Sequence, residues 1–292
     1  MEKSTKHTII GVTAIIVVMM GVFIGIYVAS GVNPPHTVVV SESMQHSPSN
    51  NMHSQLGVID AGDMILLRSK GGEGDMDIQS YVDGYKNGYS MFGSYGDVII
   101  YDRGIANPVI HRAILWLELN DDGKTWSAPS LEGYPLDMWT CASNDYNHLS
   151  GNFTMKGLGY NHNVSASINL DLLIAGPSSG FLTMGDHNYG FDAGTSVAGN
   201  ELVSYEKIKS VAWIEVPWVG SFKMILSGDV SKLDTLVPNT IPSLIAAILM
   251  FMFILFGISS LFDQRYYKKY KKEMYEDMNA LPPSFPVEDK KE

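Results

Sequence analysis

The segment that decides the fold reads His36-Thr37-Val38-Val39-Val40-Ser41-Glu42-Ser43-Met44. Its β-branched valines favour extended backbone, so it predicts a short strand that runs into an exposed serine. The segment follows closely on an uncharged apolar stretch, residues 9–32. Two hydroxyl groups, those of Ser41 and Ser43, are therefore expected near the outer surface of a membrane, at the start of an external domain.

Two uncharged apolar segments flank the rest of the chain, residues 9–32 and 241–262. Their lengths, 24 and 22 residues, exceed the roughly 20 residues that a helix needs to cross a bilayer. A cleaved signal peptide is the alternative for the first segment, because Val28-Ala29-Ser30 offers small residues for cleavage. Its apolar stretch is longer than the roughly 7–15 residues typical of signal peptides. We predict two transmembrane helices.

The basic residues near these segments indicate the orientation in the membrane. Lys3 and Lys6 precede the first segment, and five Lys and Arg residues lie between 265 and 272, just after the second. No basic residue lies in the flank after the first segment, residues 33–36. We predict a multi-pass protein of the cell membrane, with residues 1–8 and 263–292 in the cytoplasm and an extracytoplasmic domain between the spans.

The charge of the chain excludes one class of partner. The 292 residues carry a formal net charge of −11, and residues 33–240 hold 11 Lys and Arg against 23 Asp and Glu. Nucleic-acid binding needs a basic face, so we expect no nucleic-acid partner. Cys141 is the one cysteine, which excludes a disulfide within the chain.

Residues 33–240 are mostly β in pattern. Residues 62–67 and 96–101 each begin with Gly-Asp and continue as an apolar run, which predicts a turn followed by a buried strand. Further strands are predicted at 109–116 and 211–216. Residues 69–95 have the composition of a mobile loop. Residues 117–180 read as a small β and loop insertion, beginning with a hairpin turn at 121–124.

A serine needs a base before it can act as a nucleophile. Among the seven histidines of residues 33–240, His111 alone lies within an apolar strand pattern. A structural histidine is the alternative reading. Asp186 and Asp192 bracket a Gly-containing turn, and one of them could orient an imidazole. A polar Asx turn is the alternative there, and the turn has fewer oxygen ligands than a calcium loop needs. We expect no metal ion and no cofactor.

Taken in order, these features resemble the type I signal peptidases. The resemblance rests on an N-terminal span followed by six short motifs. These are Ser41-Glu42-Ser43-Met44, Gly62-Asp63-Met64-Ile65, Gly96-Asp97-Val98-Ile99-Ile100-Tyr101, His111-Arg112, Gly185-Asp186-His187-Asn188 with Asp192, and Val216-Pro217-Trp218-Val219-Gly220. Bacterial members carry a lysine before the arginine, whereas archaeal and endoplasmic-reticulum members carry histidine. This chain is similar to the second group.

The resemblance implies a mainly β fold: a signal-peptidase-like catalytic domain at 33–116 and 181–235, with the insertion at 117–180. It also implies roles by position: Ser43 as nucleophile, Ser41 at the oxyanion hole, His111 as general base, Asp192 as essential acid, Asp186 as supporting acid and Arg112 as a structural residue. The implied enzyme is a serine endopeptidase, signal peptidase I, which processes proteins for secretion by acyl-enzyme chemistry.

The implied partners are the signal peptides of preproteins with small residues at positions −1 and −3, the lipid bilayer and the Sec translocon. The chain departs from the family in having Gln45-His46-Ser47 after Met44, where the family often has Pro-Thr, and His187 where it has Asn. Two other classes stay open. One is a non-catalytic membrane-anchored paralogue or binding module that uses residues 117–180. The other is a self-processing protease of the repressor-cleaving type.

Overall fold

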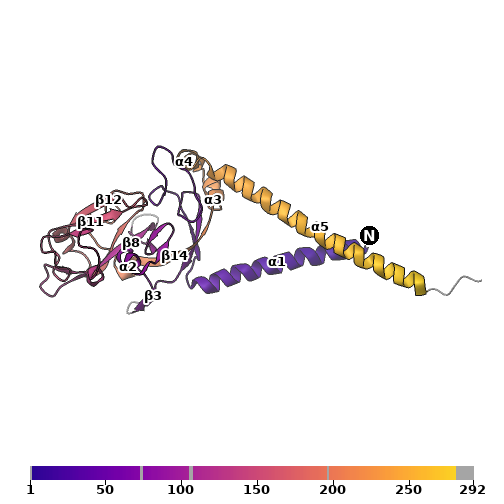
Figure 1. Cartoon of the computed structure of the whole chain (residues 1–292), viewed down its shortest axis with the longest axis horizontal. Coiled ribbons are helices and arrows are strands. Elements are labelled where there is room, and N and C mark those ends of the chain that lie inside the picture. The colour runs from indigo at the N-terminus through magenta and orange to yellow at the C-terminus, as the bar shows by residue number, and fades with distance from the viewer. Residues whose placement is uncertain (1, 73–74, 105–107, 196, 281–292) are drawn as a thin grey trace, which may run out of the picture. The chain divides into compact units, whose positions relative to one another are not determined.

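The computed structural model of the chain describes residues 2–72, 75–104, 108–195 and 197–280. The chain forms two units, Met1–Ile241 and Pro242–Glu292. The described strands all belong to the first unit, and most of the last helix forms the second. Figure 1 shows the order of these elements along the chain.

Two long helices carry the apolar segments, α1 (Glu2–Ser30) and α5 (Thr240–Ala280). Their apolar stretches, Thr13–Ser30 and Thr240–Lys272, are long and apolar enough to cross a membrane. Only 6% of each stretch is buried, so neither helix is packed as the core helix of a globular domain would be. The second helix continues well past residue 262, into the region predicted as the tail, and residues 281–292 lie outside the described part.

The main sheet is antiparallel and curls into a half-barrel, with strand order β1-β2-β14-β7-β8-β13. Its strands are β1 (His36–Val38), β2 (Met64–Arg68), β7 (Val98–Tyr101), β8 (Val109–Leu119), β13 (Ser179–Met184) and β14 (Ile208–Val216), and β9 (Trp126–Ser127) pairs with β8. The predicted strands at 64–67, 98–101, 109–116 and 211–216 are confirmed, although β8 and β14 are longer. The protein is mostly β, as predicted.

Residues 120–178 connect β8 to β13 and hold a second sheet of β10 (Trp139–Thr140), β11 (Asn152–Leu158) and β12 (Val164–Asn169). Figure 1 shows β11 and β12 side by side at one end of the β structure. The predicted turn at 121–124 is present, because Gly123 has a φ of 63° and its N–H donates to the Asn120 carbonyl. The remaining elements of this region are the 3-10 helices η1 (Pro129–Leu131) and η2 (Leu170–Leu173).

The predicted loop at 69–95 is wrong for the residues that the structure describes. This stretch contains two small hairpins, β3 (Gly71–Gly72) with β4 (Asp75–Met76) and β5 (Ser90–Met91) with β6 (Ser94–Tyr95), and the helix α2 (Tyr81–Asn87). The Ser80 side chain caps the start of α2 by accepting from the Asp83 N–H, and Gly88 ends it at a φ of 80°. The composition of this stretch does not predict the helix, because the helix is short and is stabilised by the burial of its first two residues, Tyr81 and Val82.

The largest apolar cluster joins the connection 120–178 to the main sheet. It contains Trp126 and Phe153 from the connection together with Leu115 and Leu117 of β8 and Leu182 of β13. Residues 117–180 therefore have no separate core, since their apolar side chains pack on one face of β8 and β13. Three short helices complete the first unit: η3 (Tyr205–Lys207), α3 (Ser221–Leu226) and α4 (Val230–Leu236).

Candidate active site

Ser43 lies on a tight turn that the buried side chain of Met44 anchors. The Gln45 N–H donates to the Glu42 carbonyl at 2.9 Å, which closes the turn. Met44 is fully buried in an apolar cluster, so the turn cannot shift without opening the core. Ser43 itself is half-buried, and its Oγ lies 3.3 Å from the Oγ of Ser41. The two hydroxyl groups that the sequence singled out are therefore neighbours.

His111 belongs to the middle of the main sheet. In the register of β7 and β8 it pairs with Ile99, so Tyr101 of β7 presents its side chain on the same face. Thr183 of β13 pairs with Ala113, two residues beyond His111, and shares this face as well. Three neighbouring strands thus bring an imidazole and two hydroxyl groups together on one side of the sheet.

These three side chains converge on the Oδ2 atom of Asp192. His111 Nδ1 lies 2.6 Å from it, Thr183 Oγ1 donates at 2.6 Å, and the Tyr101 hydroxyl donates at 2.9 Å. Asp192 is 1% exposed and His111 is 4% exposed. Burial opposes the charge of Asp192, but attraction to His111 in its charged form and the three hydrogen bonds outweigh it and lower the pKa of this carboxyl.

Asp186 lies in a different network, which is also buried. Arg112 Nε donates to its Oδ1 at 2.7 Å and Arg112 Nη2 to its Oδ2 at 2.5 Å, as a two-pronged ion pair. His46 Nε2 lies 2.8 Å from the same Oδ2. Burial raises the pKa of Asp186, whereas the Arg112 charge and the bonds from Arg112 and His46 lower it, and the net pKa is well below the ordinary range. Asp186 is thus an ionised partner of Arg112 and not of His111.

The turn at residues 185–188 contacts both the serine segment, which comprises residues 41–48, and His111 of β8. The His187 N–H donates to the Ser43 carbonyl at 2.9 Å. A Cβ atom on Gly185 would lie 2.4 Å from the Ser43 carbonyl oxygen and 3.0 Å from His111 Nε2. A side chain at this position would collide with both atoms, so glycine is required where the Ser43 carbonyl and His111 lie against this turn.

Ser41, Ser43 and His111 line one cavity of about 540 Å³. Its lining is mixed: the apolar residues include Val38, Val40, Ile100, Pro108, Val109 and Ile110, and the other polar residues are Thr37, Arg103, Asn188 and Lys223. His111 Nδ1 is bonded to Asp192, so Nε2 is the nitrogen available for proton transfer. Among these described side chains no hydrogen bond joins Ser43 Oγ to His111 Nε2, and Ser43 Oγ instead lies within hydrogen-bonding distance of Ser41 Oγ.

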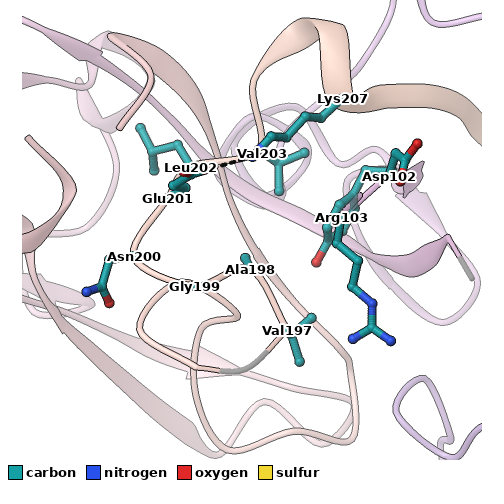
Figure 2. A pocket seen from close by; sticks show the side chains of 11 residues that line it. Asp102, Arg103, Val197, Ala198, Gly199, Asn200, Glu201, Leu202, Val203 and Lys207 are labelled. Atoms are coloured by element: carbon teal, nitrogen blue, oxygen red, sulfur yellow. Dashed lines mark hydrogen bonds and ion pairs between the residues drawn. The ribbon is translucent and has the colours of Figure 1, made fainter. Parts of the chain in front are cut away.

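A second cavity of about 320 Å³ is bounded by Tyr101, whose hydroxyl donates to Asp192. Figure 2 shows the other side chains that line it, which come from residues 102–103, 197–203 and Lys207. Arg103 and Val197 line both this cavity and the one that holds Ser43. Among the described residues, no group of three or more His, Cys, Asp or Glu side chains is placed to hold a metal ion.

The structure therefore groups the five residues that the sequence singled out into two clusters. Ser41, Ser43, His111 and Asp192 surround one cavity or bond directly to its lining, while Asp186 holds Arg112 and His46. Sequence reasoning missed Tyr101, Thr183, His46 and Asn188. Of these, Tyr101 ends the predicted strand 98–101, and a pairing of that strand with residues 109–116 would have pointed to it.

The arrangement can support proton transfer from a serine hydroxyl to an imidazole that a buried carboxylate orients. No family model and no curated protein matches this chain, so what the site does is inferred from its own chemistry.

Proposed function

We propose that this protein is a membrane-anchored serine endopeptidase of the type I signal peptidase kind, with the histidine base of the archaeal and endoplasmic-reticulum group. The observation that carries the proposal is the buried 2.6 Å contact between His111 Nδ1 and Asp192 Oδ2. The same histidine lines the cavity that Ser43 lines. The carboxylate fixes the tautomer that leaves Nε2 free to accept a proton.

The proposed reaction is acyl transfer. Ser43 Oγ exchanges its bond to Ser41 for one to His111 Nε2, gives up its proton to that nitrogen and forms a bond to the scissile carbonyl carbon. His111 then gives this proton to the leaving amine as the peptide bond breaks. Water, deprotonated by the same imidazole, hydrolyses the acyl-enzyme and returns Ser43 to its hydroxyl form.

The oxyanion that forms in each step needs hydrogen-bond donors. The backbone N–H of Ser43 and the hydroxyl of Ser41 are the proposed donors, and the 3.3 Å separation of the two Oγ atoms supports this role for Ser41. The Ser41 hydroxyl is exposed, so it can turn toward a substrate without losing a buried partner.

The proposed substrate is the signal peptide of an exported preprotein, cut after small residues at positions −1 and −3. The apolar part of the lining of the Ser43 cavity, which includes Val38, Val40 and Val109, suits such residues. The two apolar helices would anchor the enzyme in the membrane with both termini cytoplasmic, and the Sec translocon is a further proposed partner. A shared membrane confines enzyme and substrate to one surface and raises their effective concentration.

The test uses the full chain reconstituted in lipid vesicles and a preprotein with small residues before its cleavage site. Ser43→Ala should lower cleavage by at least about 10³-fold, since it removes the nucleophile. Ser143→Ala, which changes an exposed serine of the 120–178 connection, is the matched control and should cleave like the wild type. Full activity of Ser43→Ala would contradict the proposal. Labelling of Ser43 by an acylating inhibitor separates an enzyme from a non-catalytic binding module.

A further inference from the structure

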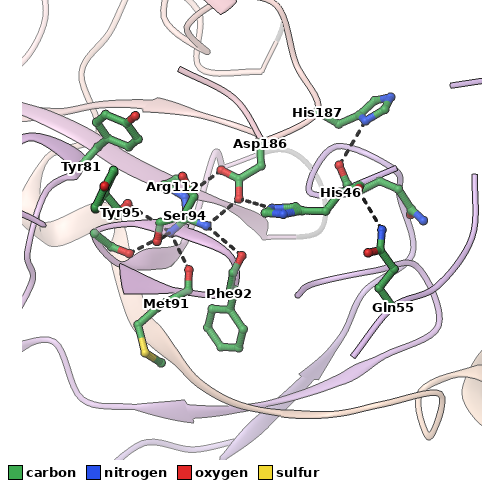
Figure 3. Close-up of polar contacts among 12 residues, drawn as sticks. His46, Gln55, Tyr81, Met91, Phe92, Ser94, Tyr95, Arg112, Asp186 and His187 are labelled. Carbon is green, nitrogen blue, oxygen red and sulfur yellow. Dashed lines mark hydrogen bonds and ion pairs between the residues drawn. The ribbon is translucent and has the colours of Figure 1, made fainter. Parts of the chain in front are cut away.

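His46 is half-buried as a residue, and it neither reaches the proposed reacting atoms nor lines the cavity of Ser43. Its side chain is 7% exposed, and its Nε2 lies 2.8 Å from Asp186 Oδ2. Figure 3 shows the imidazole approaching Asp186 from one side and the Arg112 guanidinium from the other. A polar ring so deeply buried needs a partner, and Asp186 supplies it.

The carboxylate that holds His46 is itself fixed. Arg112 donates to both oxygens of Asp186, and its Nη1 also donates to the backbone carbonyls of Met91 and Gly96 at 3.1 and 2.8 Å. Arg112 is 1% exposed, so this network is shielded from water and rigid. Asp186 is therefore a fixed point just beyond the end of β13, and His46 is bound to it.

His46 ties the serine segment to this point from the C-terminal side of Ser43. The neighbouring residue of Asp186, His187, ties the same segment directly at Ser43, through its N–H to the Ser43 carbonyl at 2.9 Å. Two adjacent residues of one turn thus hold two points of the serine segment that are three residues apart. His187 Nδ1 also lies 3.1 Å from the Gln45 carbonyl, and the Gln55 side chain donates to the His46 carbonyl at 2.8 Å.

The sequence also leaves room for the imidazole. A Cβ atom on Gly93 would lie 2.8 Å from His46 Nδ1, so glycine is required where the ring packs. Gly93 also has a φ of 79°, which other residues adopt only with strain. The position of the imidazole ring is therefore fixed at both nitrogens, because Gly93 lies against Nδ1 and Asp186 lies within hydrogen-bonding distance of Nε2.

We propose that His46 is a positioning residue. It holds the serine segment, residues 41–48, close to the turn 185–188, and at that distance Ser43 can reach His111. The proposal rests on the proposed function, because it assigns His46 a part in the same reaction. It gives a role to His46 at the point where the chain departs from the family's usual Pro-Thr. The bond from Nε2 to Asp186 is the feature that matters, and not the imidazole as such.

Three substitutions at His46 test this. The His46→Gln variant can place an amide nitrogen near the position of Nε2, whereas the His46→Asn variant places one near Nδ1 and falls short of Asp186. The His46→Leu variant fills the space of the imidazole ring but has no hydrogen-bond donor for Asp186. We expect His46→Gln to keep kcat within about threefold, and His46→Asn and His46→Leu to lower kcat by about 10- to 100-fold with KM within twofold, as misplacement of a reacting group does. His53→Leu is the matched control, because His53 is half-buried nearby and bonds to the Asn51 carbonyl and not to Asp186.

A second readout does not depend on cleavage. Backbone hydrogen exchange of residues 41–48, measured by mass spectrometry on the full chain, should rise in His46→Asn and His46→Leu and stay at the wild-type level in His46→Gln and His53→Leu. Equal kcat and equal exchange in all four variants would overturn the positioning role. A wild type that cleaves no preprotein, while exchange follows the expected order, would overturn the proposed function and leave His46 as the anchor of this segment. Loss of kcat in His46→Gln as large as in His46→Leu would show that the Asp186 bond is not the cause.

Discussion

Replacing Asp192 by Asn is the sharpest test of the proposed catalytic site. The change keeps the size of the side chain but removes the charge that faces His111 Nδ1 at 2.6 Å. An amide nitrogen at the position of Oδ2 would donate to Nδ1, which places the histidine proton on Nε2, where the base must accept one. An amide oxygen there would keep the tautomer but would no longer offset the charge of the imidazolium.

The magnitude follows from the charge pair. Two unit charges about 4 Å apart interact by about 4 kcal/mol at an effective dielectric constant of about 20. This interaction exists only once His111 has taken the proton, so its loss raises the barrier and lowers kcat by about 10³-fold. A misplaced tautomer extends the range, and we expect a fall in kcat of about 10³- to 10⁴-fold, with KM little changed.

The assay is single-turnover cleavage of a preprotein by the reconstituted full chain, with thermal unfolding followed by tryptophan fluorescence to confirm that the variant is folded. Asp145→Asn is the matched control, because Asp145 pairs with His148 at 3.0 Å but both side chains are largely exposed. Its kcat should stay within twofold of the wild type. A folded Asp192→Asn variant that loses less than tenfold in kcat would refute the role of the His111–Asp192 pair.

Four further predictions follow from the same structure. Ser41→Ala should lower kcat by about 10²-fold, measured by single-turnover cleavage, because it removes one proposed oxyanion donor. Tyr101→Phe removes one of three bonds to Asp192 Oδ2, so it should lower the free energy of unfolding by about 1.5–3 kcal/mol, measured in denaturant, and reduce kcat by tenfold or less. Burial first, and then the nearby charge of Asp60, raise the pKa of Glu215 from 4.5 to about 7. Between those two pH values the folded state keeps this proton while the unfolded chain releases it, so the free energy of unfolding falls as the pH rises. Glutamine resembles the protonated side chain at every pH. The Glu215→Gln variant should therefore gain more in melting temperature, relative to the wild type, at about pH 8 than at about pH 5. Cys141 is buried and its thiol donates to the Ser150 carbonyl, so a thiol reagent should label it about 10³-fold faster in denaturant than in the native protein.

The parts of the fold that the sequence predicted depend on local signals. The strands 64–67 and 98–101 follow Gly-Asp pairs, and Gly62 and Gly96 do have positive φ angles of 94° and 74°. An apolar run after such a turn has few alternatives to a buried strand. Helix α2 was missed because its stability comes from the burial of Tyr81 against distant residues, which no local pattern reveals.

The candidate site divides in the same way. His111 was visible because an imidazole in an apolar strand is unusual, whereas its partners depend on register. Tyr101 and Thr183 lie beside His111 only because β7 and β13 each pair with β8 in one particular register. A shift of either strand by one residue would turn its side chain to the other face of the sheet. The pair of His46 and Asp186 spans 140 positions of the chain, and no spacing rule links them.

Two histidine–aspartate pairs lie close to Ser43, and their surroundings suit the different roles proposed for them. Asp186 is already neutralised by Arg112, so its charge is committed and it can offer His46 little more than a fixed acceptor. The other partners of Asp192 are the neutral hydroxyls of Tyr101 and Thr183, so its charge is available to stabilise a positive His111. In the proposed mechanism His111 must become charged whereas His46 must stay in place, and the guanidinium of Arg112 beside Asp186 alone distinguishes the two pairs accordingly. A cation placed beside Asp192, as Arg112 is placed beside Asp186, should neutralise the carboxylate that His111 needs and so prevent His111 from acting as a base, while the protein stays folded.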